Sequence, residues 1–145
     1  MTAPMAVADC IRWEIVPGID FPAADISFSY ESPFELSVRM NFSDTVDGPN
    51  EDLQIDFDHV HAFQWESESF GLIPLPRALP KCRLPQWSLW TFPLLQCEES
   101  SWATAYRDNQ PQALDCQHFV FISMNDLLHV LASPNIHSAW VKPRE

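Results

Sequence analysis

Two histidines, His59 and His61, have the spacing that most readily suggests chemistry. On a β-strand, residues two positions apart project from the same face, so both imidazoles could bind Zn²⁺ or another transition metal if carboxylates or a third histidine converged on them. Asp56 and Asp58 are close in sequence, but a regular strand would project them from its opposite face. Ordinary packed or surface histidines are therefore the default interpretation, and a metal site is the alternative.

Nucleophilic catalysis would need a serine or cysteine, a histidine and an orienting carboxylate. Cys116 lies close to His118, but the members of a triad converge in space and not in sequence. The chain has no G-x-S-x-G motif, and its three glycines are too few for a phosphate-binding loop. We therefore expect a protein that is not an enzyme and needs no cofactor, with a small metal-binding protein or hydrolase using His59 and His61 as the alternative.

The strongest functional signal is a one-sided charge between Arg39 and Arg77. No Lys or Arg lies between these two residues, whereas acidic residues are frequent there. Such a patch would steer a basic protein partner and mainly raise the association rate, while affinity would need exposed aromatic anchors. Candidate anchors are Trp65, Phe70, Trp87 and Trp90, for which core packing is the simpler interpretation. The residues predicted to bind a partner are Asp44, Asp47, Glu51, Asp52, Asp56, Asp58, Trp65, Glu66 and Glu68.

Length and composition predict one folded domain over residues 1–145. A chain of this length can bury a real core without metals or disulfides, and 46% hydrophobic residues argue against a disordered acidic tail. The net charge of −12 would repel nucleic acid and anionic membranes, and it favours either a basic partner or simple solubility.

The location expected for the chain is the cytoplasm. The first nine residues lack the basic region and long apolar run of a secretory signal, and no apolar run approaches the roughly 20 residues that span a bilayer. The four cysteines are irregularly spaced and contain no C-x-x-C pair, so free, mostly buried thiols are expected. A disulfide framework and a zinc site are the alternatives.

The acidic residues fall on a predicted antiparallel hairpin. Apolar residues alternate over 35–43 and again over 53–57, with a polar loop between them, and the same period marks strands over 11–15 and 25–31. The short gaps between these strands favour an antiparallel meander. Beyond Phe57 the alternation would bury His59 and His61 while exposing Val60, so we expect a bend or bulge near Asp58.

The second half of the chain combines loop, strand and helix signals. Prolines make residues 71–86 an extended loop, which could itself be a ligand for an aromatic groove in a structural adaptor. A short strand is predicted over 87–92, a helix over 98–108, and a strand, a helix and a strand over 117–123, 126–132 and 138–142. The predicted class is α+β: mainly antiparallel sheet with two short helices, a C-terminal strand-helix-strand unit, and a flexible N-terminus over residues 1–9.

Two segments resemble small bacterial immunity proteins encoded beside secreted antibacterial toxins. They are Phe57 to Glu66, with its aromatic strand positions, and Phe119 to Ala132, the predicted strand-helix unit. The resemblance implies a cytoplasmic, acidic, single-domain protein that neutralises a cognate toxin by covering its active or basic surface. It implies no catalytic residues.

Overall fold

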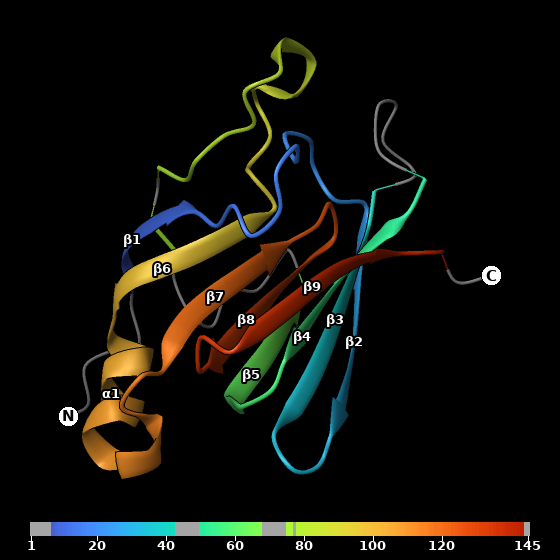
Figure 1. The fold of residues 1–145 in the computed structure, drawn as a ribbon. Coiled ribbons are helices and arrows are strands. Elements are labelled where there is room, and N and C mark those ends of the chain that lie inside the picture. The colour runs from blue at the N-terminus through green and yellow to red at the C-terminus, as the bar shows by residue number, and fades with distance from the viewer. Residues whose placement is uncertain (1–6, 43–49, 68–74, 77, 144–145) are drawn as a thin grey trace.

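The computed structural model describes residues 7–42, 50–67, 75–76 and 78–143, which form two antiparallel β-sheets facing each other (Figure 1). The five-stranded sheet has the spatial order β1 (Val7–Arg12), β6 (Leu94–Ser100), β7 (Gln117–Ile122), β8 (Asp126–Ala132) and β5 (Val60–Ser67). The four-stranded sheet has the order β2 (Asp25–Glu31), β3 (Glu35–Asn41), β4 (Asp52–Phe57) and β9 (Ile136–Val141). Helix α1 (Ser101–Asn109) and the 3-10 turns η1 (Pro85–Trp87) and η2 (Pro111–Ala113) complete the described elements.

The core lies between the two sheets and follows directly from strand alternation. On β3 and β4, every second residue is apolar and buried: Leu36, Val38, Met40, Leu53, Ile55 and Phe57. Phe57 meets the opposite sheet, where its ring centroid lies 5.6 Å from that of Phe119 and 6.0 Å from that of Phe121. The remaining residues of β3 and β4 are thereby turned to the outer face of the four-stranded sheet.

A second buried layer covers the other face of the five-stranded sheet. Trp102 of α1 packs there against His118 of β7 and His129 of β8, with ring centroids 5.2 and 6.4 Å apart. Because both faces of β7 and β8 are covered, these strands contain continuous runs of buried residues and not an alternating pattern.

The hairpin prediction is confirmed, as is the irregularity near Asp58. Strands β3 and β4 pair antiparallel, and β2 has the predicted bounds. After Phe57 the chain leaves the four-stranded sheet and enters the five-stranded one at Val60, with a register shift between Val60 and Ala62. What we expected to be one bent strand is therefore two strands that belong to different sheets.

The helix predicted over 126–132 is wrong, because this segment is strand β8. Its apolar run is buried on both sides, and a short run of this kind cannot be distinguished from a buried helix by periodicity. The turn before β8 is held by the Ser123 hydroxyl, which accepts hydrogen bonds from the backbone amides of Asn125 and Asp126, at 3.2 and 3.1 Å. The C-terminal unit is thus strand-strand-strand, and α1 is the one α-helix in the described residues.

Other boundaries also differ from the prediction. Strand β6 occupies Leu94–Ser100, so Glu98 and Glu99 end a strand, and the predicted helix begins only at Ser101, where the Ser100 hydroxyl accepts a hydrogen bond from the Ala103 amide. In the segment 87–92 only Thr91 forms a bridge, with Lys81, and η1 precedes it. Strand β1 starts at Val7, inside the segment expected to be flexible. Residues 1–6, 71–74 and 77 lie outside the described residues.

No helix within the described ranges is long and apolar enough to cross a membrane.

Candidate functional site

The outer face of the four-stranded sheet carries a row of polar residues from all four strands. Strand register places Ser29 beside Ser37, Ser37 beside Asp56, and Asp56 beside His137. One step along the sheet, Glu31 of β2 lies directly opposite Glu35 of β3. Residues far apart in the sequence are therefore brought together on one surface, which we call the acidic face.

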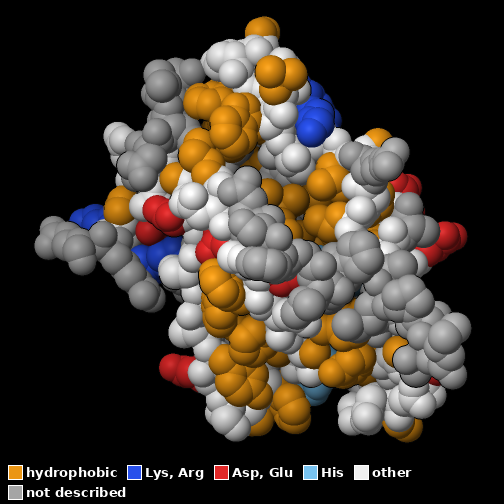
Figure 2. All heavy atoms as spheres, turned by 180° about the vertical axis from the view of Figure 1, so that it is seen from behind, with side chains coloured by type: hydrophobic (Ala, Val, Ile, Leu, Met, Phe, Trp, Pro, Cys, Tyr) orange, Lys and Arg blue, Asp and Glu red, His pale blue; other side chains and the backbone are white. Residues whose placement is uncertain are grey.

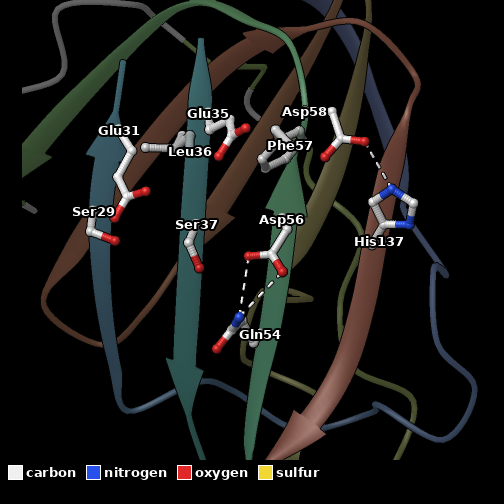
Figure 3. A pocket seen from close by; sticks show the side chains of 10 residues that line it. All are labelled: Ser29, Glu31, Glu35, Leu36, Ser37, Gln54, Asp56, Phe57, Asp58 and His137. Atoms are coloured by element: carbon white, nitrogen blue, oxygen red, sulfur yellow. Dashed lines mark hydrogen bonds and ion pairs between the residues drawn. The ribbon is translucent and has the colours of Figure 1, made fainter. Parts of the chain in front are cut away.

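The acidic face is hollowed by a depression of about 460 Å³ (Figure 3). Four carboxylates line it, from Glu31, Glu35, Asp56 and Asp58, and no Lys or Arg is among the lining residues in the described part of the chain. Leu36 and Phe57 are also among its lining residues, although their side chains are buried in the core on the other face of the sheet. The depression therefore presents negative charge to whatever enters it.

Hydrogen bonds fix two of these carboxylates. The Asp58 Oδ2 atom lies 2.9 Å from His137 Nε2, and both side chains are substantially exposed. The side-chain nitrogen of Gln54, Nε2, donates to both carboxylate oxygens of Asp56, at 3.3 and 3.2 Å. These contacts orient the carboxylates of Asp56 and Asp58 and bring no Lys or Arg side chain to them (Figure 3).

The basic residue nearest in the strand pattern, Arg39, is already engaged. Its guanidinium donates to Gln54 Oε1 at 2.9 Å and lies 3.9 Å from the carboxylate of Asp52, which is buried. Arg39 is thus engaged with Asp52 and Gln54 and not with the four carboxylates of the depression.

Aromatic side chains lie along the adjoining edge of the molecule, between edge strands β2 and β5. Phe63 of β5 packs against Phe28 and Tyr30 of β2, with ring centroids 5.4 and 5.7 Å apart. Phe28 and Tyr30 are 38% and 46% exposed, and the neighbouring Trp65 is 51% exposed. Figure 2 shows hydrophobic side chains gathered in a band on the lower part of the side seen from behind. We call Phe28, Tyr30, Phe63 and Trp65 the aromatic edge.

The structure separates the residues predicted to bind a partner. Asp56 and Asp58 line the depression, and Glu51 is exposed just before β4. Asp52 and Glu66 are buried, at 4% and 3% exposure, which disfavours direct contact of either side chain with a partner. Trp65 is exposed on the other sheet, where its indole nitrogen donates to Asp126 at 2.9 Å. Asp44, Asp47, Glu68 and Phe70 lie outside the described residues.

Three titratable residues of the acidic face, Glu31, Glu35 and His137, are not among the site residues that the sequence predicts. Glu31 follows Ser27 and Ser29 on the polar face of a correctly predicted strand, so alternation combined with hairpin pairing could have placed it opposite Glu35. His137 comes from the distant strand β9, and no local pattern could have paired it with Asp58.

The other two described aromatic anchors differ in exposure: Trp90 is exposed, whereas Trp87 packs against the core.

His59 and His61 lie side by side, as predicted, but in a mixed aromatic pocket. Their ring centroids are 4.7 Å apart, and His59 stacks on Phe34 at 4.6 Å. Burial, followed by the proximity of His59, lowers the pKa of His61. Tyr106, Gln110 and Gln112 complete the described lining of this pocket. No group of three or more His, Cys, Asp or Glu residues in the described part of the chain is arranged to hold a metal ion.

A buried polar chain lies beneath α1. Ser100 Oγ is 2.7 Å from His118 Nδ1, and His118 Nε2 is 2.9 Å from His129 Nδ1. Burial lowers the pKa of His118 to about 3, with a further contribution from His129, and burial lowers that of His129 to about 4. With both rings neutral, two arrangements satisfy both contacts: the serine hydroxyl donates to His118 and His118 donates to His129, or His129 donates to His118 and His118 donates to the hydroxyl. The hydroxyl and both rings are at most 1% exposed, so this chain is a structural element of the sheet.

Comparison with known proteins adds no relative to this description: no protein-family model, no curated protein and no solved structure matches the chain.

Proposed function

We propose that this chain is a non-catalytic binding protein that neutralises a bacterial toxin by covering a basic surface of that toxin. The observation that carries the proposal is the acidic face, where four carboxylates line one depression without a Lys or Arg among its described lining residues. The net charge of −12 extends the same preference to long range, since an acidic protein attracts a basic partner before contact.

The geometry of β2 supports a binding surface with two components. Alternation sends Ser29 and Glu31 to the acidic face, and Phe28 and Tyr30 to the aromatic edge. Charges at the rim of an interface mainly raise the association rate, whereas buried aromatic side chains supply most of the affinity. A partner that wraps the edge at β2 would use both.

The identity of the partner as a toxin rests on the resemblance of the segment Phe57 to Glu66 to small bacterial immunity proteins. The second segment, Phe119 to Ala132, lends no support, because it contains strands β7 and β8 and not a strand-helix unit. Under this proposal the chain acts in the cytoplasm of the producing cell, where an immunity protein meets its toxin. It has no catalytic step, requires no cofactor, and binds neither nucleic acid nor membrane.

The experiment that tests the proposal co-expresses the chain with the toxin encoded by the neighbouring gene. We expect a complex that survives purification and protects the cell against the toxin. Absence of both complex and protection would rule out the immunity function.

A charge-reversal pair tests the acidic face separately. In Asp56→Lys/Asp58→Lys, the association rate at low salt should fall roughly ten-fold or more, because steering depends on the sign of the local charge. The matched control, Glu98→Lys/Asp108→Lys, changes the net charge equally at exposed positions on β6 and α1. Equal association rates for the two variants would remove the acidic face from the interface.

A further inference from the structure

Two of the four buried cysteines meet across a strand pair. Cys10 of β1 lies directly opposite Cys97 of β6, and their Sγ atoms are 2.8 Å apart. Opposed residues in antiparallel strands have Cα atoms about 4.5 or 5.5 Å apart, and disulfides span Cα separations of about 4.4–6.8 Å. The backbone is therefore already in position for a covalent bond between these two side chains.

We propose that Cys10 and Cys97 form an oxidation site, at which a hydroperoxide converts the two thiols into a disulfide that crosslinks β1 to β6. In the first step the Cys10 sulfur attacks one peroxide oxygen, an S–O bond forms and the O–O bond breaks. The leaving oxygen takes up the Cys10 proton and departs as water from hydrogen peroxide, or as an alcohol from an organic hydroperoxide. In the second step the Cys97 sulfur attacks the Cys10 sulfenic acid, the S–S bond forms, the S–O bond breaks and a water molecule leaves with the Cys97 proton. The two sulfurs are oxidised and the peroxide is reduced.

The order of the two steps follows from the electrostatics of the pair. The hydrogen bond from Cys97 lowers the pKa of Cys10, against the opposing effects of burial and of Asp9. The same hydrogen bond, together with burial, raises the pKa of Cys97. Because the thiolate is the reactive form, Cys10 is the sulfur that attacks first and Cys97 is the one that resolves the intermediate.

The other two cysteines differ from this pair in both position and reactivity. Burial raises the pKa of Cys82 and of Cys116 to about 11, so both stay protonated at neutral pH. The Cys82 thiol is directed to the carbonyl oxygen of Thr91, 3.8 Å away. These two residues are therefore internal controls for an oxidation that is specific to the pair.

Access to the pair is provided by the position of β1. It is an edge strand of the five-stranded sheet, and its residues Asp9 and Ile11 are exposed. Cys10 and Cys97 are only 4% and 7% exposed, which favours a small oxidant and a local opening of the edge strand. In a reducing compartment the resulting bond would be transient, as is usual for disulfides that respond to oxidants.

The test is peptide mapping of the native full-length chain after treatment with hydrogen peroxide and alkylation of the remaining thiols. Cleavage after Lys and Arg, except where proline follows, places the four cysteines on four separate peptides, covering residues 1–12, 82–83, 84–107 and 108–144. We expect a crosslinked species that joins peptide 1–12 to peptide 84–107, lighter by two hydrogens than their sum and split by dithiothreitol. Cys82 and Cys116 should both be recovered in the alkylated form, which shows that peroxide left them as free thiols.

Matched variants make the assignment sharper. Cys82→Ala/Cys116→Ala should still form the crosslink at an unchanged rate, and Cys10→Ala should leave Cys97 free. Recovery of all four cysteines as free thiols after peroxide treatment of the native wild-type chain would overturn the proposal, as would a crosslink that involves Cys82 or Cys116. Because the mapping is performed on the wild-type protein, the result does not depend on the folding of any variant.

Discussion

The Nε2 atom of His118 lies 2.9 Å from the Nδ1 atom of His129, and both rings are almost completely shielded from water. Neither ring can accept a proton without a charge appearing in this enclosed layer. The Glu66 carboxylate is 3.8 Å from His129 Nε2, too far for a hydrogen bond, so burial dominates the protonation of His129.

We therefore expect stability to decrease as the pH falls below about 6.5, the pKa of histidine in an unfolded chain. The folded-state pKa values of His118 and His129 are lowered to about 3 and about 4, so between these values and 6.5 the unfolded chain binds more protons. Each histidine then contributes a slope of about 1.4 kcal/mol per pH unit to the free energy of unfolding. Urea unfolding between pH 5 and 7 measures this slope.

The double variant His118→Asn/His129→Asn should flatten this dependence, whatever its stability at pH 7. His137→Asn, at an exposed histidine bonded to Asp58, is the matched control, and the double variant should show the smaller slope of the two. An unchanged slope in the double variant would contradict neutral buried histidines.

Ser100→Ala should destabilise the chain through two separate losses. The hydroxyl caps α1 by accepting from the Ala103 amide at 3.2 Å, and it is the partner of His118 Nδ1. The loss of the cap, together with a buried His118 Nδ1 atom left without its partner, should lower the free energy of unfolding by about 2 kcal/mol. Ser27→Ala, at an exposed position on β2, is the control and should change the unfolding midpoint little. A loss no larger than in the control would show that the hydroxyl is not the cap.

Glu31→Lys should stabilise the protein and weaken its proposed interaction at the same time. Glu31 faces Glu35 across β2 and β3, and like charges in directly opposed positions are unfavourable. An attractive pair in their place should raise the free energy of unfolding by roughly 0.2–1 kcal/mol. The association rate with the basic partner should fall, because the depression loses a carboxylate. A stabilised variant that binds at the wild-type rate would exclude Glu31 from the binding surface.

Phe57→Ala and Phe28→Ala should separate the core from the aromatic edge. Phe57 is 1% exposed and packs against the opposite sheet, so its truncation should cost about 3–5 kcal/mol. Phe28 is 38% exposed, and its truncation should cost clearly less while reducing affinity for the partner. Chemical denaturation and a binding titration on the same two proteins measure both effects. Equal losses of stability would contradict this division.

The sequence predicts those strands that have one face exposed to solvent and the other face buried. Strands β2, β3 and β4 alternate visibly because their polar residues reach the outer face of their sheet. Strand β8 is covered on both sides, so its pattern carries no period and was interpreted as a helix. The elements that cover β8 come from distant parts of the chain, so the local sequence of β8 does not show that both of its faces are buried.

The candidate site was predictable only in part, for the same reason. Asp56 and Asp58 belong to the correctly predicted acidic segment and reach the depression. Asp52 and Glu66 carry the same charge in the same segment, but Arg39 and His129 are their neighbours in the folded chain and both acids are buried. Charge counted along the sequence therefore overestimates the charge that a partner meets.

The crossing from β4 to β5 has a mechanical consequence. Asp58 lines the acidic face of one sheet, and His59, the next residue, leads into the strand that carries the aromatic edge of the other. A partner that binds both surfaces would connect the two sheets where the chain crosses between them, and it would restrict their movement relative to each other. In the complex, this restriction should make amide hydrogen exchange slower along β5 than along β1, the edge strand on the far side of the same sheet.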